Sequence, residues 1–172
     1  MDAATALRIA VIEDDWRYRA SLEQLFSHTP GFQLAGSFAD PPDALAALER
    51  ARGGPTVRWD VVMMDLEMPS MSGIEATRRL KRLQPGLKIV VLTVFEDPRA
   101  IVEAVSAGAD GYLLKKARAR ELIDGVRAVA EGGAPLTADV ARTVLNVLRT
   151  LDTAAPDAAR GTPPDAARSH GA

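Results

Sequence analysis

The feature that most constrains the fold is an alternation between short apolar runs and longer segments with helical periodicity. The short runs are rich in β-branched residues, whereas the longer segments repeat apolar residues every three or four positions. Five such pairs follow one another, which is typical of an α/β domain with a parallel sheet. The predicted strands are residues 8–12, 32–38, 61–64, 89–92 and 112–114.

Three of the predicted strands, at 61–64, 89–92 and 112–114, contain only apolar residues. Strands that are covered on both faces have this composition, so these three should be central. We therefore expect a flavodoxin-like (βα)5 fold, a doubly wound parallel sheet with strand order 2-1-3-4-5. An extra C-terminal helix should follow from about 137 to 151, because its apolar residues form one stripe: Val140, Val144, Val147, Leu148 and Leu151.

The length and the local composition predict one domain followed by a helix and a tail. A chain of 172 residues suits a single domain of ordinary size. Residues 1–133 form the predicted domain, and 134–151 form a C-terminal linker helix. Residues 152–172 contain no Val, Ile, Leu, Met or aromatic side chain, so this Ala/Pro-rich tail is expected to be disordered.

Charge and composition exclude several classes of function. The net charge is -2 and the estimated pI is 5.7, so the chain has no electrostatic reason to bind nucleic acid. The tail carries three acids and two arginines and cannot serve as a basic DNA arm. The absence of cysteine fits a reducing compartment, and the cytoplasm is the expected location. We expect neither a signal peptide nor a membrane span, because every apolar stretch is too short.

Acidic residues follow two of the predicted strands. Glu13, Asp14 and Asp15 come after the first strand, and Asp65 comes after the third. If these strands are neighbours, Glu13, Asp14 and Asp65 converge, and each pair of carboxylates about 4 Å apart repels by roughly 4 kcal/mol at an effective dielectric of about 20. A divalent cation would relieve this repulsion. Oxygen ligands without His or Cys favour Mg²⁺.

Two further polar residues stand at strand ends, Thr93 after the fourth strand and Lys115 after the fifth. Taken singly, each acidic group is more often a helix cap or a solvated loop residue, Thr93 a hydroxyl cap, and Lys115 a surface lysine. Taken together, four of five strands deliver a polar group to the same rim. The set then offers a hydrogen-bond donor for a phosphoryl group and a positive counter-charge.

Four motifs occur in order at the expected strand ends: residues 9–15, Asp65-Leu66-Glu67-Met68-Pro69 with Gly73, Leu92-Thr93, and Gly111-Tyr112-Leu113-Leu114-Lys115. This set resembles the receiver domain of two-component response regulators over about residues 8–133. The segments 111–116, 122–133 and 136–139 are similar to those of the NarL/LuxR-type subfamily. Lys116 departs from the pattern, because many relatives carry proline after the active-site lysine.

The resemblance implies a role for each residue of the rim. Asp65 would be the phosphoacceptor, Thr93 would hydrogen-bond the phosphoryl group, and Lys115 would pair with it. Tyr112 would be an aromatic switch that rotates inward when Thr93 moves, although strand packing is an alternative for a tyrosine there. The implied Mg²⁺ ligands are Asp14 directly, Glu13 partly through water, Asp65, and the backbone carbonyl of Glu67. Pro69 and Gly73 would shape the loop.

The implied function is a signalling switch that is not a turnover enzyme. A sensor histidine kinase or a small acyl phosphate would supply the phosphoryl group, and Asp65 would attack as a carboxylate that is already ionised at neutral pH. Only self-phosphorylation and slow self-dephosphorylation are expected. A phosphatase with an aspartyl nucleophile is a remote alternative, because Glu67 stands where such enzymes carry a second Asp.

The route of output stays open at the level of sequence. Phosphorylation is expected to change the face made by the fourth helix, the fifth strand and the fifth helix. NarL/LuxR-type relatives carry a helix-turn-helix domain that binds DNA, and this chain contains none, so DNA contact would need a domain absent from the chain. A free-standing receiver that acts by protein contact is the alternative. The extra helix is expected either to pack on its own domain or to form a homodimer on phosphorylation.

Overall fold

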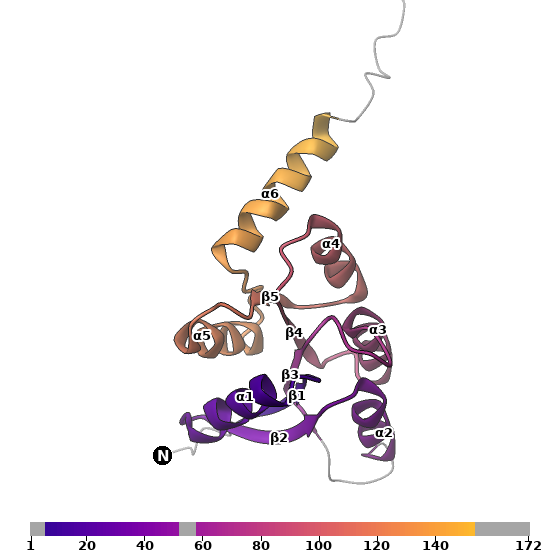
Figure 1. The fold of residues 1–172 in the computed structure, drawn as a ribbon, viewed down its shortest axis with the longest axis vertical. Helices are drawn as coiled ribbons and strands as arrows, with labels where there is room; N and C mark the ends of the chain where they lie inside the picture. Colours follow the sequence, from indigo (N-terminus) through magenta and orange to yellow (C-terminus); the bar gives the residue numbers. More distant parts are fainter. Residues whose placement is uncertain (1–5, 52–57, 154–172) are drawn as a thin grey trace, which may run out of the picture.

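The structure is a computed structural model that describes residues 6–51 and 58–153. Within these ranges five strands alternate with five helices, and a sixth helix follows (Figure 1). The strands are β1 (Leu7–Ile12), β2 (Phe32–Phe38), β3 (Val61–Met64), β4 (Lys88–Thr93) and β5 (Gly111–Leu114). The helices are α1 (Trp16–His28), α2 (Pro41–Ala51), α3 (Gly73–Leu83), α4 (Pro98–Ala107), α5 (Ala119–Ala130) and α6 (Ala138–Thr153). All five predicted strands are present, and β1, β4 and β5 extend slightly beyond the predicted limits.

The strands form one parallel sheet in the order β2-β1-β3-β4-β5. The predicted fold class and strand order are therefore confirmed. β1 pairs with β2 on one side and with β3 on the other, so the strand order reverses between β1 and β3. Ile12 and Met64, the last residues of these two strands, are in register. The chain therefore leaves both strands at the same point of the sheet edge, where ligands bind in folds of this kind.

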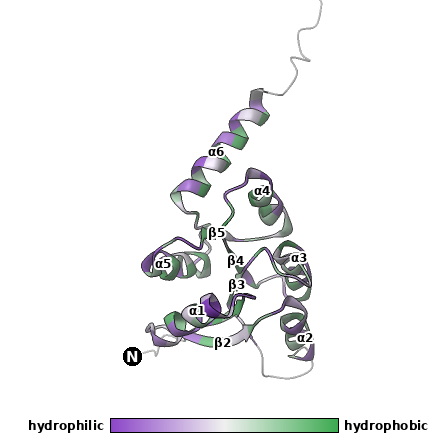
Figure 2. Cartoon of the chain, in the orientation of Figure 1, coloured by the Kyte–Doolittle hydropathy of each residue, from purple (hydrophilic) through white to green (hydrophobic). Residues whose placement is uncertain are grey.

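Helices cover both faces of the sheet because its central strands are apolar on both sides. Ile9 and Val11 of β1 pack in a cluster with α1 and α5, whereas Ala10 and Ile12 pack in a cluster with α2 and α3. Each helix carries both hydrophobic and hydrophilic residues, as expected where one side meets the sheet (Figure 2). Burial of one such aliphatic side chain contributes about 1.5–3 kcal/mol, so this double cover fixes the sheet rigidly.

Helix α6 starts on the domain and then leaves it (Figure 1). The segment before it is bound to β5, because the Tyr112 amide donates to the Pro135 carbonyl at 3.0 Å. Val140 is fully buried in a third cluster with α4 and β5, whereas Leu148 and Leu151 are 57% and 63% exposed. Packing on its own domain is thus confirmed for the start of α6 and is wrong for its end.

The end of α6 corrects the predicted start of the tail. Asp152 belongs to the helix, which ends at Thr153, because helical backbone hydrogen bonds continue past the last apolar side chain. The rest of the predicted disordered tail lies outside the described residues. In the two described ranges, no helix combines the length and the apolar character needed to cross a membrane.

The loop between β3 and α3 passes very close to the start of α3 at Gly73. A Cβ atom on Gly73 would lie 1.8 Å from the carbonyl oxygen of Asp65. The Gly73 amide donates to the Leu66 carbonyl at 2.8 Å, which holds the loop in this tight path. Ser72 caps the helix by accepting from the Glu75 amide at 3.2 Å. The backbone at Asp65 therefore keeps its place only if residue 73 has no side chain.

We predict that Gly73→Ala lowers the free energy of unfolding by at least about 2 kcal/mol, because the backbone of Asp65 must move to admit the methyl group. Gly86→Ala is the matched control, since a Cβ there meets nothing within 4 Å. That variant should be neutral or slightly stabilising. Urea denaturation measures both changes. Equal effects of the two substitutions would contradict the steric account.

Candidate functional site

Three carboxylates meet where the strand order reverses. Glu13 and Asp14 follow β1, and Asp65 follows β3. Carboxylate oxygens of the three residues lie within 4.8 Å of one another. The Asp65 amide donates to the Ile12 carbonyl at 3.0 Å. The hydrogen bonds between β1 and β3 therefore position Asp65 next to the two other acids. The structure therefore brings together the three acids that the sequence predicted to converge.

Burial and mutual repulsion raise the pKa of the Asp65 carboxyl. Asp65 and Glu13 are buried, at 5% and 1% exposed, while Asp14 is exposed. Burial comes first and the charge of Glu13 second, and together they raise the pKa of Asp65 to about 7, against the attraction of Lys115 and a hydrogen bond from the Leu66 amide. Both causes favour the protonated form of this carboxyl. Further positive charge beside Asp65 would lower this pKa.

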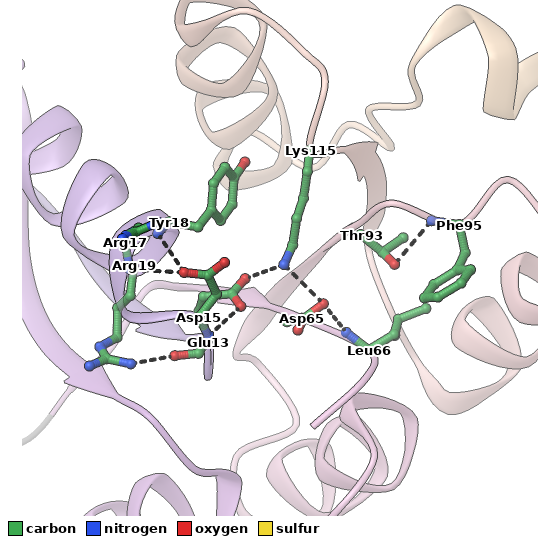
Figure 3. A network of polar contacts seen from close by, with 10 residues as sticks. All are labelled: Glu13, Asp15, Arg17, Tyr18, Arg19, Asp65, Leu66, Thr93, Phe95 and Lys115. Carbon is green, nitrogen blue, oxygen red and sulfur yellow. Dashed lines mark hydrogen bonds and ion pairs between the residues drawn. The ribbon is translucent and has the colours of Figure 1, made fainter. Parts of the chain in front are cut away.

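Lys115 enters the same pocket from the end of β5. Its Nζ atom lies 2.6 Å from Glu13 Oε2 and 3.5 Å from Asp65 Oδ1. The ammonium also lies 4.9 Å from the centre of the Tyr18 ring, on α1. Figure 3 shows the lysine reaching between Tyr18 and the carboxylates of Glu13 and Asp65. One cation therefore offsets the charge of two buried carboxylates, which leaves the pocket negative.

Thr93 and Tyr112 meet at the backbone of Phe95. Thr93 is buried at the end of β4, and its hydroxyl oxygen accepts a hydrogen bond from the Phe95 amide at 3.3 Å. Tyr112 is also buried, and its hydroxyl donates to the Phe95 carbonyl at 3.0 Å. Burial and the nearby charge of Asp97 raise the pKa of Tyr112 to about 12, so this hydroxyl remains protonated. The Tyr112 side chain is thus already turned inward without a phosphoryl group, and its rotation when Thr93 moves stays a prediction.

The exposed side of the pocket is an open hollow beside Asp14. Asp14 and Glu67 both line this hollow of about 440 Å³, together with residues of the β3–α3 loop. Glu67 is exposed on that loop, close enough to the acids to share the same opening. Carboxylate oxygens without nitrogen or sulfur donors are the ligand set that Mg²⁺ prefers. The residues present therefore fit a magnesium ion.

Sequence reasoning missed several contacts that support this rim. Asp15 caps α1 by accepting from the Arg17 and Tyr18 amides, and Arg19 donates to the Glu13 carbonyl at 2.7 Å. Tyr18 stands in the first turn of α1, directly after the acids, and this position brings it near the pocket. Lys116 Nζ contacts Glu96 Oε1 at 2.6 Å and Asp139 Oδ2 at 2.8 Å. That pairing joins segments distant in sequence and has no local signal.

A family model and proteins of known sequence are similar to this chain over most of its length. Residues 9–127 match the family model of the response regulator receiver domain. The transcriptional regulatory protein DegU of Brevibacillus brevis is 31% identical over 145 residues, which make up 84% of this chain and 59% of DegU. The transcriptional regulatory protein LiaR of Bacillus subtilis (strain 168) is 35% identical over 143 residues, 83% of this chain and 65% of LiaR. The chain thus spans less than two thirds of either relative.

Solved structures with the same fold include a response regulator and a receiver domain protein. A two-component response regulator of the LuxR family from Aurantimonas sp. SI85-9A1 superposes with a TM-score of 0.75 at 26% identity, over 84% of this chain and 99% of that one. A CheY-like receiver domain protein from Methanospirillum hungatei JF-1 gives a TM-score of 0.66 at 24% identity, over 74% of this chain and 95% of its own. The second likeness concerns the fold alone.

The raised pKa of Asp65 predicts how stability depends on pH. Because the pKa of Asp65 is higher in the folded state than its ordinary value of 3.8, the stability present at low pH is lost as the pH rises through about 7. Asp65→Asn cannot ionise and leaves Lys115 paired with Glu13. In EDTA this variant should exceed the wild type in unfolding free energy by about 1–4 kcal/mol at about pH 8, and the gap should narrow toward about pH 4.5.

Thermal unfolding of both proteins across this pH range measures the difference. A gap of constant size from pH 4.5 to 8 would contradict a pKa of Asp65 near 7, because only a titrating carboxyl makes the difference depend on pH.

Proposed function

Because the chain belongs to the response regulator receiver-domain family, we propose that it is a phosphorylation switch whose phosphoacceptor is Asp65. The donor would be the phosphohistidine of a sensor histidine kinase or a small acyl phosphate, met in the cytoplasm. The observation that carries the proposal is the pocket itself. A buried carboxylate with a raised pKa lies 3.5 Å from a lysine ammonium and beside two further acids that suit a hard cation.

Magnesium would be held by the acids of this pocket and by one backbone group. We assign Asp14 and Asp65 as direct ligands, Glu13 as a ligand partly through water, and the Glu67 carbonyl as the backbone ligand. Bound Mg²⁺ would supply positive charge toward the oxygens of the transferred group. The fit rests on oxygen donors within 4.8 Å of one another and on the need of these acids for a counter-charge.

Phosphoryl transfer would use groups that already lie in place. One Asp65 carboxylate oxygen forms a bond to phosphorus while the P–N bond of a phosphohistidine, or the P–O bond of an acyl phosphate, breaks and its electron pair leaves with the donor. The product is an aspartyl phosphate. Lys115 would pair with the added negative charge, since its ammonium is near Asp65. The Thr93 hydroxyl would turn from the Phe95 amide to a phosphoryl oxygen.

The Phe95 peptide would carry the change away from the site. The Phe95 amide donates to the Thr93 hydroxyl, and the Phe95 carbonyl accepts from the Tyr112 hydroxyl. A movement of Thr93 therefore disturbs a segment to which Tyr112 is hydrogen-bonded. Tyr112 packs in one cluster with Ile101 of α4 and Val140 of α6. We infer that phosphorylation acts through this cluster and alters both the α4–β5–α5 face and the packing of the start of α6 on the domain.

Transcription regulation is the output that we propose, exerted through a DNA-binding helix-turn-helix domain. The relatives DegU and LiaR are both named transcriptional regulatory proteins, and the chain matches less than two thirds of each. A free-standing receiver that acts by protein contact is the second candidate, favoured by the exposed apolar end of α6. An aspartyl phosphatase is disfavoured, because its nucleophile loop follows the first strand and Asp65 follows β3.

Acetyl phosphate with Mg²⁺ should add one phosphoryl group to the wild-type chain. Intact-mass spectrometry measures the labelled fraction, and the label should be absent from Asp65→Asn, since an amide cannot form the aspartyl phosphate. Release of phosphate should stay near one equivalent over the time of labelling. Undiminished labelling of Asp65→Asn would refute the assignment, and rapid catalytic release of phosphate would favour the phosphatase.

Substitutions of two neighbouring acids distinguish a metal ligand, Asp14, from a helix cap, Asp15. We expect Asp14→Ala to weaken Mg²⁺ binding at least about tenfold in a calorimetric titration, because it removes one direct ligand. Asp15→Asn keeps an oxygen for the α1 amides and is expected to bind Mg²⁺ within about twofold of the wild type. Equal losses of Mg²⁺ affinity in the two variants would contradict the assignment of Asp14, rather than Asp15, as the metal ligand.

The exposed end of α6 predicts a homodimer that strengthens on phosphorylation. Leu148 and Leu151 line an apolar hollow of about 240 Å³ with Val102 and Val105 of α4, and all four side chains are more than 45% exposed. Leu148→Asp combined with Leu151→Asp should keep the chain monomeric by placing charges in this seam. Asn146→Asp, on the same helix outside the hollow, is the control. Analytical ultracentrifugation that finds only monomers of the phosphorylated wild type at high concentration would exclude the dimer.

A further inference from the structure

The ring of Tyr18 makes an unexpected contact with the active-site lysine. Its centre lies 4.9 Å from Lys115 Nζ, and the two residues also line one hollow of about 670 Å³ between α1 and α5. The Tyr18 hydroxyl is buried and has no hydrogen-bond partner among the described residues. Because its hydroxyl has no protein partner in the described part of the chain, Tyr18 contributes its ring, and the ammonium of Lys115 lies over that ring.

The ring is held firmly from two directions. The Tyr18 amide donates to the Asp15 side chain at 3.2 Å, which fixes the residue in the first turn of α1. The side chain packs against the core cluster beneath α1 and α5. Lysine, in contrast, carries its charge on a flexible four-carbon stem, and its orientation depends on what its ammonium touches. Tyr18 therefore offers a rigid surface to a mobile group.

The three contacts of Lys115 differ in what the proposed reaction does to them. Glu13 and Asp65 are both assigned to the cation site, and Asp65 also becomes phosphorylated. The Tyr18 ring takes no part in either change, and its hydroxyl stays protonated because burial and the charges of Glu13 and Asp65 raise its pKa to about 12. The face of a neutral aromatic ring attracts an ammonium throughout, and the attraction grows where water is excluded. The Lys115 side chain is only 17% exposed.

We infer that Tyr18 is a positioning residue for phosphoryl transfer: its ring face holds the Lys115 ammonium beside Asp65 while the carboxylates change partners. This inference rests on the proposed function. It assigns to α1 a part in the chemistry that the strand-end residues alone do not supply.

Core packing is the competing explanation, and substitutions at Tyr18 separate the two. Tyr18→Phe keeps the ring and removes a hydroxyl that has no partner, whereas Tyr18→Leu fills part of the space without a π face. Leu25→Ala is the matched control, since Leu25 packs on the same cluster from the same helix, about two turns beyond Tyr18, and offers no π face to Lys115. If Tyr18 only packs, the rate of Asp65 labelling should fall in proportion to the loss of stability in all three variants. If Tyr18 positions Lys115, the rate should fall only in the variant that lacks an aromatic ring at residue 18.

The first measurement is the rate of Asp65 labelling by acetyl phosphate at saturating Mg²⁺ and donor. Tyr18→Phe should stay within about twofold of the wild type, while Tyr18→Leu should fall about three- to tenfold, the size expected for loss of a partly desolvated cation–π contact. Leu25→Ala should keep the wild-type rate despite a lower melting temperature. Mg²⁺ affinity should be the same within about twofold in all. A wild-type rate in Tyr18→Leu, or an equal loss in Leu25→Ala, would overturn the inference.

The second measurement needs neither metal nor donor. Ring current should shift the ε-methylene protons of Lys115 upfield in the NMR spectrum of the wild type and of Tyr18→Phe, and the shift should vanish in Tyr18→Leu or, if that variant does not fold, in Tyr18→Met. Ordinary lysine shifts in the wild type would overturn the inference. If the ring shift is present but Asp65 is not labelled in any protein, the proposed function fails while the Tyr18–Lys115 contact stands.

Discussion

Pairing of the two parallel strands β1 and β3 places Glu13, Asp14 and Asp65 within 4.8 Å of one another, and the rest of the site follows from that crowding. Like charges at this separation repel strongly where water is excluded. Lys115 offsets part of the repulsion, while burial and the charge of Glu13 raise the pKa of Asp65. A pocket of this kind favours a cation, and in our account a phosphoryl group follows the cation. The apolar core holds the acids together at the expense of local stability.

A buried cluster around Tyr112 could carry a change at the site to α6. Tyr112 is bonded to the Phe95 backbone and packs with Val140, so the site and the start of α6 share one buried cluster. Lys116 adds ion pairs to Glu96 and Asp139, but its side chain is 62% exposed, and exposed pairs contribute under about 1 kcal/mol. The buried cluster therefore contributes most of the free energy that holds α6 on the domain. The ion pairs of Lys116 help to orient the helix but add little to its stability.

The sequence predicted the features that depend on local pattern. Apolar runs located all five strands, and residues at the strand ends identified the acids, Thr93 and Lys115, because parallel strands bring their carboxyl ends to one edge. It missed what depends on tertiary contact. Burial beside Glu13 changes the pKa of Asp65, which its residue type cannot indicate. The ring of Tyr18 on Lys115 and the exposed end of α6 likewise arise from how distant elements pack.

The central claim is that burial, together with repulsion from Glu13, raises the pKa of Asp65 until a cation enters the pocket. A ¹³C NMR titration of the Asp65 carboxyl carbon, assigned with Asp65→Asn, tests this claim directly. Without divalent cations the carboxyl should titrate near pH 7, well above the ordinary value of 3.8. With saturating Mg²⁺ its pKa should fall by at least about two units, since the cation stabilises the ionised form. An Asp65 that titrates near pH 4 in both conditions would contradict the account.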